Sequence, residues 1–252
     1  MCFMIYLDIN IKELKNRFNF QPRATYAQKS WQGNVLGPQK TNKIPVVFND
    51  KNHISCEEMY WSLCPPWSKE FPCKWNTYNA RLVREQKNKR TGAEFTQKIY
   101  DVPTFKNSFR AQNFCLVPIT YAVESCYWGD VAGNIVKFGQ ESSETFYIAG
   151  LWDEWTNTSS GEVHRSVTLL TDRPYRYFFE HGHDRSIIAI DEQKFEQFLA
   201  RNFKNPHESF NFIKDNRVSK NWAHKIERPL KDGWQKHIPS SSELEKIALS
   251  TF

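Results

Sequence analysis

A run of short apolar segments between residues 115 and 171 limits the possible folds of this chain more than any other feature. Each segment has the length of a β-strand, and turn-forming residues separate them, including Gly129, Gly133, Gly139 and the cluster at 157–161. This pattern is typical of consecutive β-hairpins. The expected strands cover residues 115–117, 119–128, 134–138, 145–152 and 163–171.

The remainder of the chain adds a few strands and places helices at its edges. Further strands are expected at residues 3–7, 44–48, 55–63 and 187–190, and loops or turns at 28–42, 65–72 and 87–92. Helices are expected at 11–18, capped by Asp8 or Asn10, at 103–113, after Asp191, and near the C-terminus, where Ser242 and Glu245 form a capping box. The predicted class is therefore α+β, with a mainly antiparallel, barrel-like β core and peripheral helices.

The composition and the N-terminal segment exclude few classes of function, but they indicate where the protein is located in the cell. The 252 residues carry 34 basic and 28 acidic side chains, and the resulting charge of +6 is compatible with a nucleic-acid surface but also with many basic enzymes. The apolar start has only seven residues before Asp8 and lacks the features of a signal peptide. No stretch has the length of a membrane span. We therefore expect a cytoplasmic protein without a membrane partner.

The cysteines do not form a pattern that binds metal. All six stand among apolar neighbours, which favours free, buried thiols in a reducing compartment. No Cys-x-x-Cys pair occurs, and no cysteine or carboxylate pair completes a ligand set with His181 and His183. Neither a metal nor another cofactor is expected.

Cys2 can offer chemistry that is restricted to an N-terminal cysteine. Initiator methionine is usually removed before a small residue, and its removal leaves an α-amine and a thiol on Cys2, with reference pKa values of about 7.7–8.0 and about 8.5. Such a pair attacks an aldehyde twice, first forming an imine and then closing a thiazolidine ring. Taken alone, however, Met-Cys also fits a chain that simply begins near a strand.

Four later segments follow Cys2 in a definite order. They are Trp61-Ser62-Leu63-Cys64-Pro65-Pro66-Trp67 with Asn79-Ala80-Arg81, Cys115-Leu116-Val117-Pro118 ahead of Glu124, Ala149-Gly150-Leu151-Trp152, and His183-Asp184-Arg185. Together with Cys2 they resemble the SOS response-associated peptidase (SRAP) family, whose members sense abasic sites with an N-terminal catalytic cysteine. Each motif alone is weak, whereas the ordered set is specific. The resemblance implies one domain over residues 2–252, with its motifs within about 2–190 and a C-terminal helical extension over about 191–252.

The resemblance implies a catalytic role for four residues. Cys2 matches the nucleophile, Asn79 the asparagine that orients the sugar, Glu124 the acid/base carboxylate and His183 the proton-shuttling histidine. An abasic deoxyribose is mostly a closed hemiacetal, and a positioned carboxylate or imidazole accelerates its opening by about 10²–10⁴-fold each. Without the motifs, Glu124 would be read as a solvent-facing strand residue and His183 as a structural histidine.

The resemblance also implies a grip on single-stranded DNA. Arg81 and Arg185 match arginines that bind phosphates, and Trp67 matches the aromatic residue that stacks beside the lesion. The basic loop at 87–90 is expected to be solvated. Core positions are expected for four other tryptophans, Trp61, Trp75, Trp128 and Trp152.

The chain departs from the family pattern at three places. Phe3 and Met4 replace the usual Gly-Arg after the cysteine, which removes one expected phosphate contact. Leu82-Val83-Arg84 replaces Ala-Glu-Thr after the Asn-Ala-Arg motif, and Ser186-Ile187 replaces Met-Pro after His-Asp-Arg. These changes indicate a divergent member.

The leading hypothesis is a monomeric abasic-site sensor of the DNA damage response. Cys2 would form a thiazolidine crosslink with the ring-opened sugar in single-stranded DNA and shield the lesion, so the protein would be an SRAP-type peptidase or lyase-like protein that is consumed by its reaction. Two alternatives remain: a cysteine-nucleophile hydrolase that uses Cys2 and His183, and a non-catalytic single-stranded DNA-binding module whose binding survives Cys2→Ala.

Overall fold

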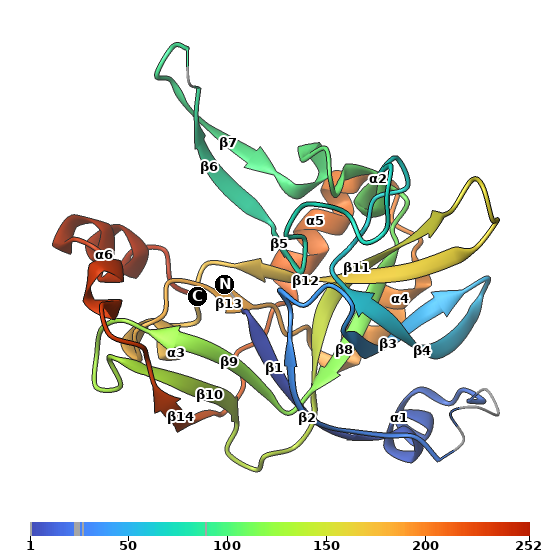
Figure 1. Cartoon of the computed structure of the whole chain (residues 1–252), viewed down its shortest axis with the longest axis horizontal. Helices are drawn as coiled ribbons and strands as arrows, with labels where there is room; N and C mark the ends of the chain where they lie inside the picture. Colours follow the sequence, from blue (N-terminus) through green and yellow to red (C-terminus); the bar gives the residue numbers. More distant parts are fainter. Residues whose placement is uncertain (1, 23–25, 27, 89) are drawn as a thin grey trace.

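In the computed structural model, the N-terminal strand β1 (Met4–Asn10) is paired on both sides (Figure 1), and Cys2, two residues before it, belongs to the main core. The structure describes residues 2–22, 26, 28–88 and 90–252; Met1, whose removal is expected above, and Lys89 of the basic loop lie outside them. Alternate β1 side chains, Ile5, Leu7 and Ile9, are buried. This period of two is what a strand with one face on the core requires.

Over the described residues, β1 belongs to a five-stranded antiparallel sheet with the order β14, β10, β9, β1, β2. The other strands are β2 (Ser30–Leu36), β9 (Tyr121–Cys126), β10 (Asn134–Gln140) and β14 (Trp222–Pro229). Met4 lies opposite Val123 of β9, so the N-terminus runs beside the strand that carries Glu124.

The second sheet has seven strands among the described residues and is antiparallel except where β12 pairs with β4 and β5. Its strands are β3 (Lys43–Asp50), β4 (His53–Trp61), β5 (Asn79–Arg81), β8 (Phe114–Ile119), β11 (Phe146–Thr156), β12 (Val163–Asp172) and β13 (Ser186–Ile187). Every residue of β8 is buried, so the main core lies around this strand.

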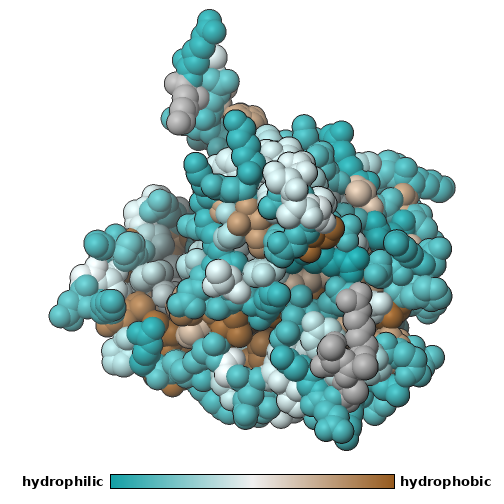
Figure 2. All heavy atoms as spheres, turned by 45° about the vertical axis from the view of Figure 1, so that its right-hand side comes forward, coloured by the Kyte–Doolittle hydropathy of each residue, from teal (hydrophilic) through white to brown (hydrophobic). Residues whose placement is uncertain are grey.

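A two-stranded hairpin of β6 (Val83–Lys87) and β7 (Glu94–Lys98) projects from the body directly after β5 (Figure 1). Its surface is mainly hydrophilic (Figure 2). Of the predicted loop at 87–92, Lys87 belongs to strand β6, and Arg90 and Thr91 lie in a turn before β7.

Short helices surround the sheets, as expected for the α+β class, and the predicted class with its barrel-like core is confirmed. The helices are α1 (Ile11–Phe18), η2 (Ile99–Asp101), α2 (Lys106–Arg110), α3 (Arg176–Glu180), η3 (Glu192–Lys194), α4 (Phe195–Ala200), α5 (Pro206–Asp215), η4 (Trp234–His237) and α6 (Ser241–Ala248). Asn10 caps α1 by accepting a hydrogen bond from the Lys12 N–H, as predicted. None of the described helices is long and apolar enough to span a membrane.

One prediction about an extended segment is wrong and another is shifted at its ends, because long-range pairing decides both. The predicted loop at 28–42 contains β2, whose polar residues become a strand by pairing along the whole of β1. The predicted strand at 119–128 is present as β9, but it begins only at Tyr121, because the chain changes sheet at Thr120 between β8 and β9. There the Thr120 N–H donates to the Tyr6 carbonyl, and the Thr120 hydroxyl accepts from the Asp8 N–H.

Near the C-terminus, the predicted helical extension over 191–252 includes a strand, because β14 pairs with β10. The capping box lies two residues earlier than predicted, with Ser240 and Glu243 as its members. The predicted strand at 187–190 is reduced to the two residues of β13, and the predicted helix at 103–113 to the five residues of α2.

Candidate functional site

Cys2 is buried, with 1% of its surface exposed, at the start of β1. Its thiol donates to the Met4 carbonyl at 3.3 Å, and its own carbonyl accepts from the Asn79 side-chain amide at 2.5 Å. Burial raises the pKa of the Cys2 thiol, and the negative charge of Glu124 raises it further. Cys2 is therefore held as a neutral thiol beside a carboxyl group.

Glu124 is 1% exposed and lies in β9, next to β1. Its Oε2 is 3.3 Å from His183 Nε2. Burial raises the pKa of Glu124 to about 7, although its interaction with the Cys2 thiol acts in the opposite direction. The interpretation of Glu124 as a solvent-facing residue is excluded, and the carboxyl group can exchange a proton near neutral pH.

His183 is 4% exposed and follows the turn after α3. Its Nδ1 is 3.0 Å from the carbonyl oxygen of Ser125. Because a carbonyl only accepts, Nδ1 carries the ring proton, and Nε2 presents its lone pair to Glu124. Burial lowers the pKa of His183 to about 3, so a proton shared by the pair lies on Glu124 and not on His183.

Two glycines let the loop before His183 touch the end of β9. Gly182, at φ +88°, and Gly129, at φ +74°, each face the backbone of the opposite segment, and a Cβ on either would overlap a carbonyl oxygen, that of Trp128 or Glu180. The Tyr127 N–H donates to the Gly182 carbonyl at 2.9 Å. Backbone contact at this point fixes His183 relative to Glu124.

Gly182→Ala is expected to lower the free energy of unfolding by about 3 kcal/mol or more, because left-handed strain adds to overlap with the Trp128 carbonyl. Gly161 is the matched control, since it has φ +73° and no atom within 4 Å of an added Cβ. Gly161→Ala should cost about 1–2 kcal/mol, the strain alone. Urea unfolding of both variants measures the difference, and equal losses would contradict the close approach.

Three arginines gather where β5 and β13 both pair with β12. Thr171 of β12 lies opposite Arg81 on one side and Ile187 on the other, so Arg185 comes to the same end of the sheet. Burial lowers the pKa of Arg81 and of Arg84, and the charge of Arg185 lowers both further. Among the described residues, the buried Nε of Arg81 has no hydrogen-bond partner.

Arg185 forms an ion pair with Asp184 at 3.1 Å, and three guanidinium groups this close together suit a phosphate oxygen. Sequence reasoning did not assign Arg84 a role. The sequence did contain a signal for such a role, because Arg84 replaces the threonine of the family pattern with a positively charged residue.

Trp67 lies outside the contacts that join Cys2, Asn79, Glu124 and His183. It is 48% exposed and its ring centroid is 5.3 Å from that of Trp75, which is 49% exposed. The two rings line a cavity of about 310 Å³ together with Lys69 and Lys74. The prediction that Trp75 belongs to the core is therefore wrong, because the proline-rich segment carries it outward, whereas Trp61 and Trp152 are buried as predicted.

No cluster of three histidine, cysteine or acidic side chains that could hold a metal ion occurs among the described residues. The candidate site contains a thiol, a carboxyl group, an imidazole and an amide, with guanidinium groups close by. Such a set can move protons and bind anions.

Comparison with protein families gives one match over almost the whole chain, to SOS response associated peptidase (SRAP), at residues 1–230. The chain belongs to the SRAP family. Among curated relatives, the abasic site processing protein YoqW of Bacillus subtilis is 23% identical over 202 residues, 79% of this chain and 80% of the relative. The abasic site processing protein YoaM of the same organism is 26% identical over 177 residues, 69% of this chain and 68% of the relative.

Solved structures resemble the SRAP chain in fold. A Bacteroides thetaiotaomicron protein superposes with a TM-score of 0.69 at 15% identity and covers 98% of both chains. A Bordetella bronchiseptica protein superposes with a TM-score of 0.65 at 16% identity, over 89% of this chain and 99% of its own. At these identities the likeness concerns the arrangement of the elements alone.

Proposed function

We propose that this SRAP protein processes abasic sites in single-stranded DNA by covalent capture through Cys2. The observation that carries the proposal is the buried cluster in which Cys2 contacts Asn79 and lies beside the Glu124–His183 pair. The names of YoqW and YoaM support abasic sites as the substrate class. The chemistry requires hydrolysis of the Met1–Cys2 peptide bond, so that the α-amine of Cys2 becomes free.

The first step opens the sugar. The C1′–O4′ bond of the closed hemiacetal breaks, O4′ gains a proton, and the C1′ hydroxyl loses one to become the aldehyde. Protonated Glu124 supplies the proton to O4′, and neutral His183 Nε2 returns a proton to Glu124 after accepting it from the C1′ hydroxyl. The free Oδ1 of Asn79, a buried acceptor without a partner among the described residues, holds the sugar hydroxyl.

The second step captures the aldehyde. The Cys2 amine adds to C1′ and water leaves, which gives an imine. The thiol sulfur then adds to the same carbon while its proton passes to the imine nitrogen through Glu124, and a five-membered thiazolidine closes. One aldehyde and one aminothiol thus yield one ring and one water, with no change in oxidation state.

The surrounding groups hold the strand. Arg81, Arg84 and Arg185 bind phosphate oxygens, as guanidinium groups do through paired hydrogen bonds. Trp67 and Trp75 offer exposed rings on which bases stack irrespective of their identity. Single-stranded DNA is favoured because its bases are free to stack on such rings.

The site fits the hydrolase alternative poorly. A cysteine hydrolase needs a thiolate, and the pKa of the Cys2 thiol is raised instead of lowered. The imidazole Nε2 of His183 faces Glu124, whereas the Cys2 thiol donates to a backbone carbonyl. A non-catalytic binding module would have no use for this buried set of proton-transferring groups.

The test is whether adduct formation depends on the aldehyde. Purified protein, with Met1 removal checked by mass spectrometry, is mixed with a single-stranded oligonucleotide that contains one abasic site. On a denaturing gel we expect a slow band that a tetrahydrofuran analogue without the aldehyde does not give. The adduct mass should equal protein plus DNA minus one water. Absence of the band with the true abasic strand would overturn covalent capture.

A further inference from the structure

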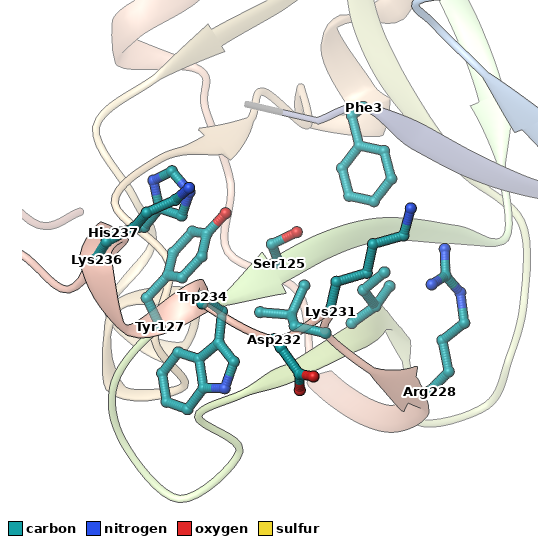
Figure 3. A pocket seen from close by; sticks show the side chains of 12 residues that line it. Phe3, Ser125, Tyr127, Arg228, Lys231, Asp232, Trp234, Lys236 and His237 are labelled. Carbon is teal, nitrogen blue, oxygen red and sulfur yellow. The ribbon is translucent and has the colours of Figure 1, made fainter.

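A second cavity, of about 310 Å³, lies beside the capture cluster and is built largely by the C-terminal part of the chain (Figure 3). We call it the C-terminal pocket. The end of β14, the following turn and η4 form one wall, and the end of β9 forms another. Its lining residues are Phe3, Ser125, Tyr127, Ile135, Arg228, Leu230, Lys231, Asp232, Gly233, Trp234, Lys236 and His237.

The C-terminal pocket adjoins the capture cluster through two residues. Phe3 follows Cys2 in the chain, and its side chain points toward the pocket in Figure 3. Ser125 follows Glu124, lines the pocket, and holds His183 Nδ1 with its carbonyl at 3.0 Å. The pocket is therefore next to the residues that would hold a sugar bound at Cys2.

Positive charge dominates the pocket wall. Arg228, Lys231 and Lys236 line it, and within the described part of the chain none of the three forms an ion pair. Asp232 is the single carboxylate among the lining residues. The excess of cations attracts a phosphodiester, since Lys and Arg near a DNA backbone release its counterions.

Aromatic side chains border the same cavity. The Tyr127 and His237 rings lie 5.4 Å apart, and Trp234 packs against Gly133, where an added Cβ would come within 2.8 Å of the indole. Rings that are held in place in this way offer surfaces for a base, and stacking of this kind tolerates any base. Cations and rings in one cavity match the two parts of a nucleotide.

We propose that the C-terminal pocket binds the nucleotide next to the captured sugar, with Lys231 and Lys236 on its phosphates. This inference rests on the proposed function and adds a DNA-binding site from the C-terminal part of the chain. Lys231 to His237 follow the residues that the family model matches, which end at 230. The pocket supplies positive charge close to Met4, where the family pattern has an arginine.

The experiment measures binding of a fluorescent single-stranded oligonucleotide with ordinary bases, which contains no aldehyde, by anisotropy over a range of salt concentrations. The Lys231→Ala/Lys236→Ala variant is expected to bind roughly tenfold more weakly or worse at low salt. Its plot of log affinity against log salt should become shallower by about 1.4, for two lost phosphate contacts on a single strand. Lys12→Ala/Lys15→Ala is the control, because both lysines are exposed on α1, away from β14, and the change in net charge is the same (Figure 1).

The outcomes separate this inference from the proposed function. Equal affinities and slopes for the two double variants would overturn the pocket as a DNA site, even if Cys2 still captured abasic DNA. A selective loss in Lys231→Ala/Lys236→Ala would support the pocket even if no covalent adduct formed.

Discussion

Replacement of Cys2 by serine is expected to abolish the heat-stable adduct with abasic single-stranded DNA. Serine leaves the N-terminal amine and nearly the same volume, so Met1 removal and the buried position should persist. Its hydroxyl is a far weaker nucleophile toward the imine, and no thiazolidine closes. The reversible imine should remain, and borohydride reduction should trap it as a band that the untreated sample lacks.

The control for this variant is another buried free cysteine. Cys56 lies in β4 and is 4% exposed, and Cys56→Ser should form the adduct like the wild type. A heat-stable band of undiminished strength from Cys2→Ser, without borohydride, would contradict thiazolidine formation. Circular dichroism of both variants shows whether a missing band reflects chemistry or loss of the fold.

Glu124→Gln is expected to slow adduct formation about 10²–10⁴-fold, because the amide cannot donate or accept the proton that ring opening requires. The dependence of the rate of adduct formation on pH tests the role of Glu124 as the acid more directly. Glu124, with a pKa of about 7, is the acid only while protonated, so the rate should fall as pH rises through about 7. The amine acts only when unprotonated and loses its proton around pH 7.7–8.0, roughly, so the rate should also fall toward low pH. The wild-type profile should therefore be bell-shaped.

In the Glu124→Gln variant, the fall in rate above neutral pH should disappear. The fall in rate toward low pH, which depends on the amine, should remain. Asp153→Asn is a suitable comparison, because Asp153 is also a buried carboxylate, 7% exposed, but accepts from the Ser108 hydroxyl in another part of the fold. Single-turnover rates with excess protein, measured between pH 5 and pH 9 by gel, give both profiles. A Glu124→Gln profile that keeps the fall in rate above neutral pH would assign it to another group.

Local patterns in the sequence were sufficient for much of the fold. Alternation of apolar residues and glycine-containing turns predicted β10, β11 and β12, since hairpin partners are close in the chain and burial on one face imposes the period of two. The same reasoning failed for β2 and β14. Both strands mix polar residues with a few apolar ones, and each is paired along its length with a strand that is distant or not predicted to be its neighbour, β1 or β10.

The candidate site, too, was predicted from the sequence only in part. The ordered motifs around Cys2 were sufficient to select Asn79, Glu124 and His183, because the whole set of motifs in this order is specific although each motif alone is weak. No spacing predicted that Glu124 would be buried beside a thiol, nor that Arg84 would join Arg81 and Arg185.

The sequence by itself determined the class of fold, the family and the candidate site residues, since these depend on local periodicity and on the identity of side chains. Only the tertiary structure decided the protonation states of these residues. Burial between β1, β9 and the loop at Gly182 places the proton on Glu124 and keeps His183 neutral, because removal of water penalises the charged form of each. The tertiary structure also exposes Trp75. It brings Arg228, Lys231 and Lys236, which are more than 200 residues from Cys2 in the sequence, into one pocket beside Cys2, because the fold determines which charged side chains lie close together.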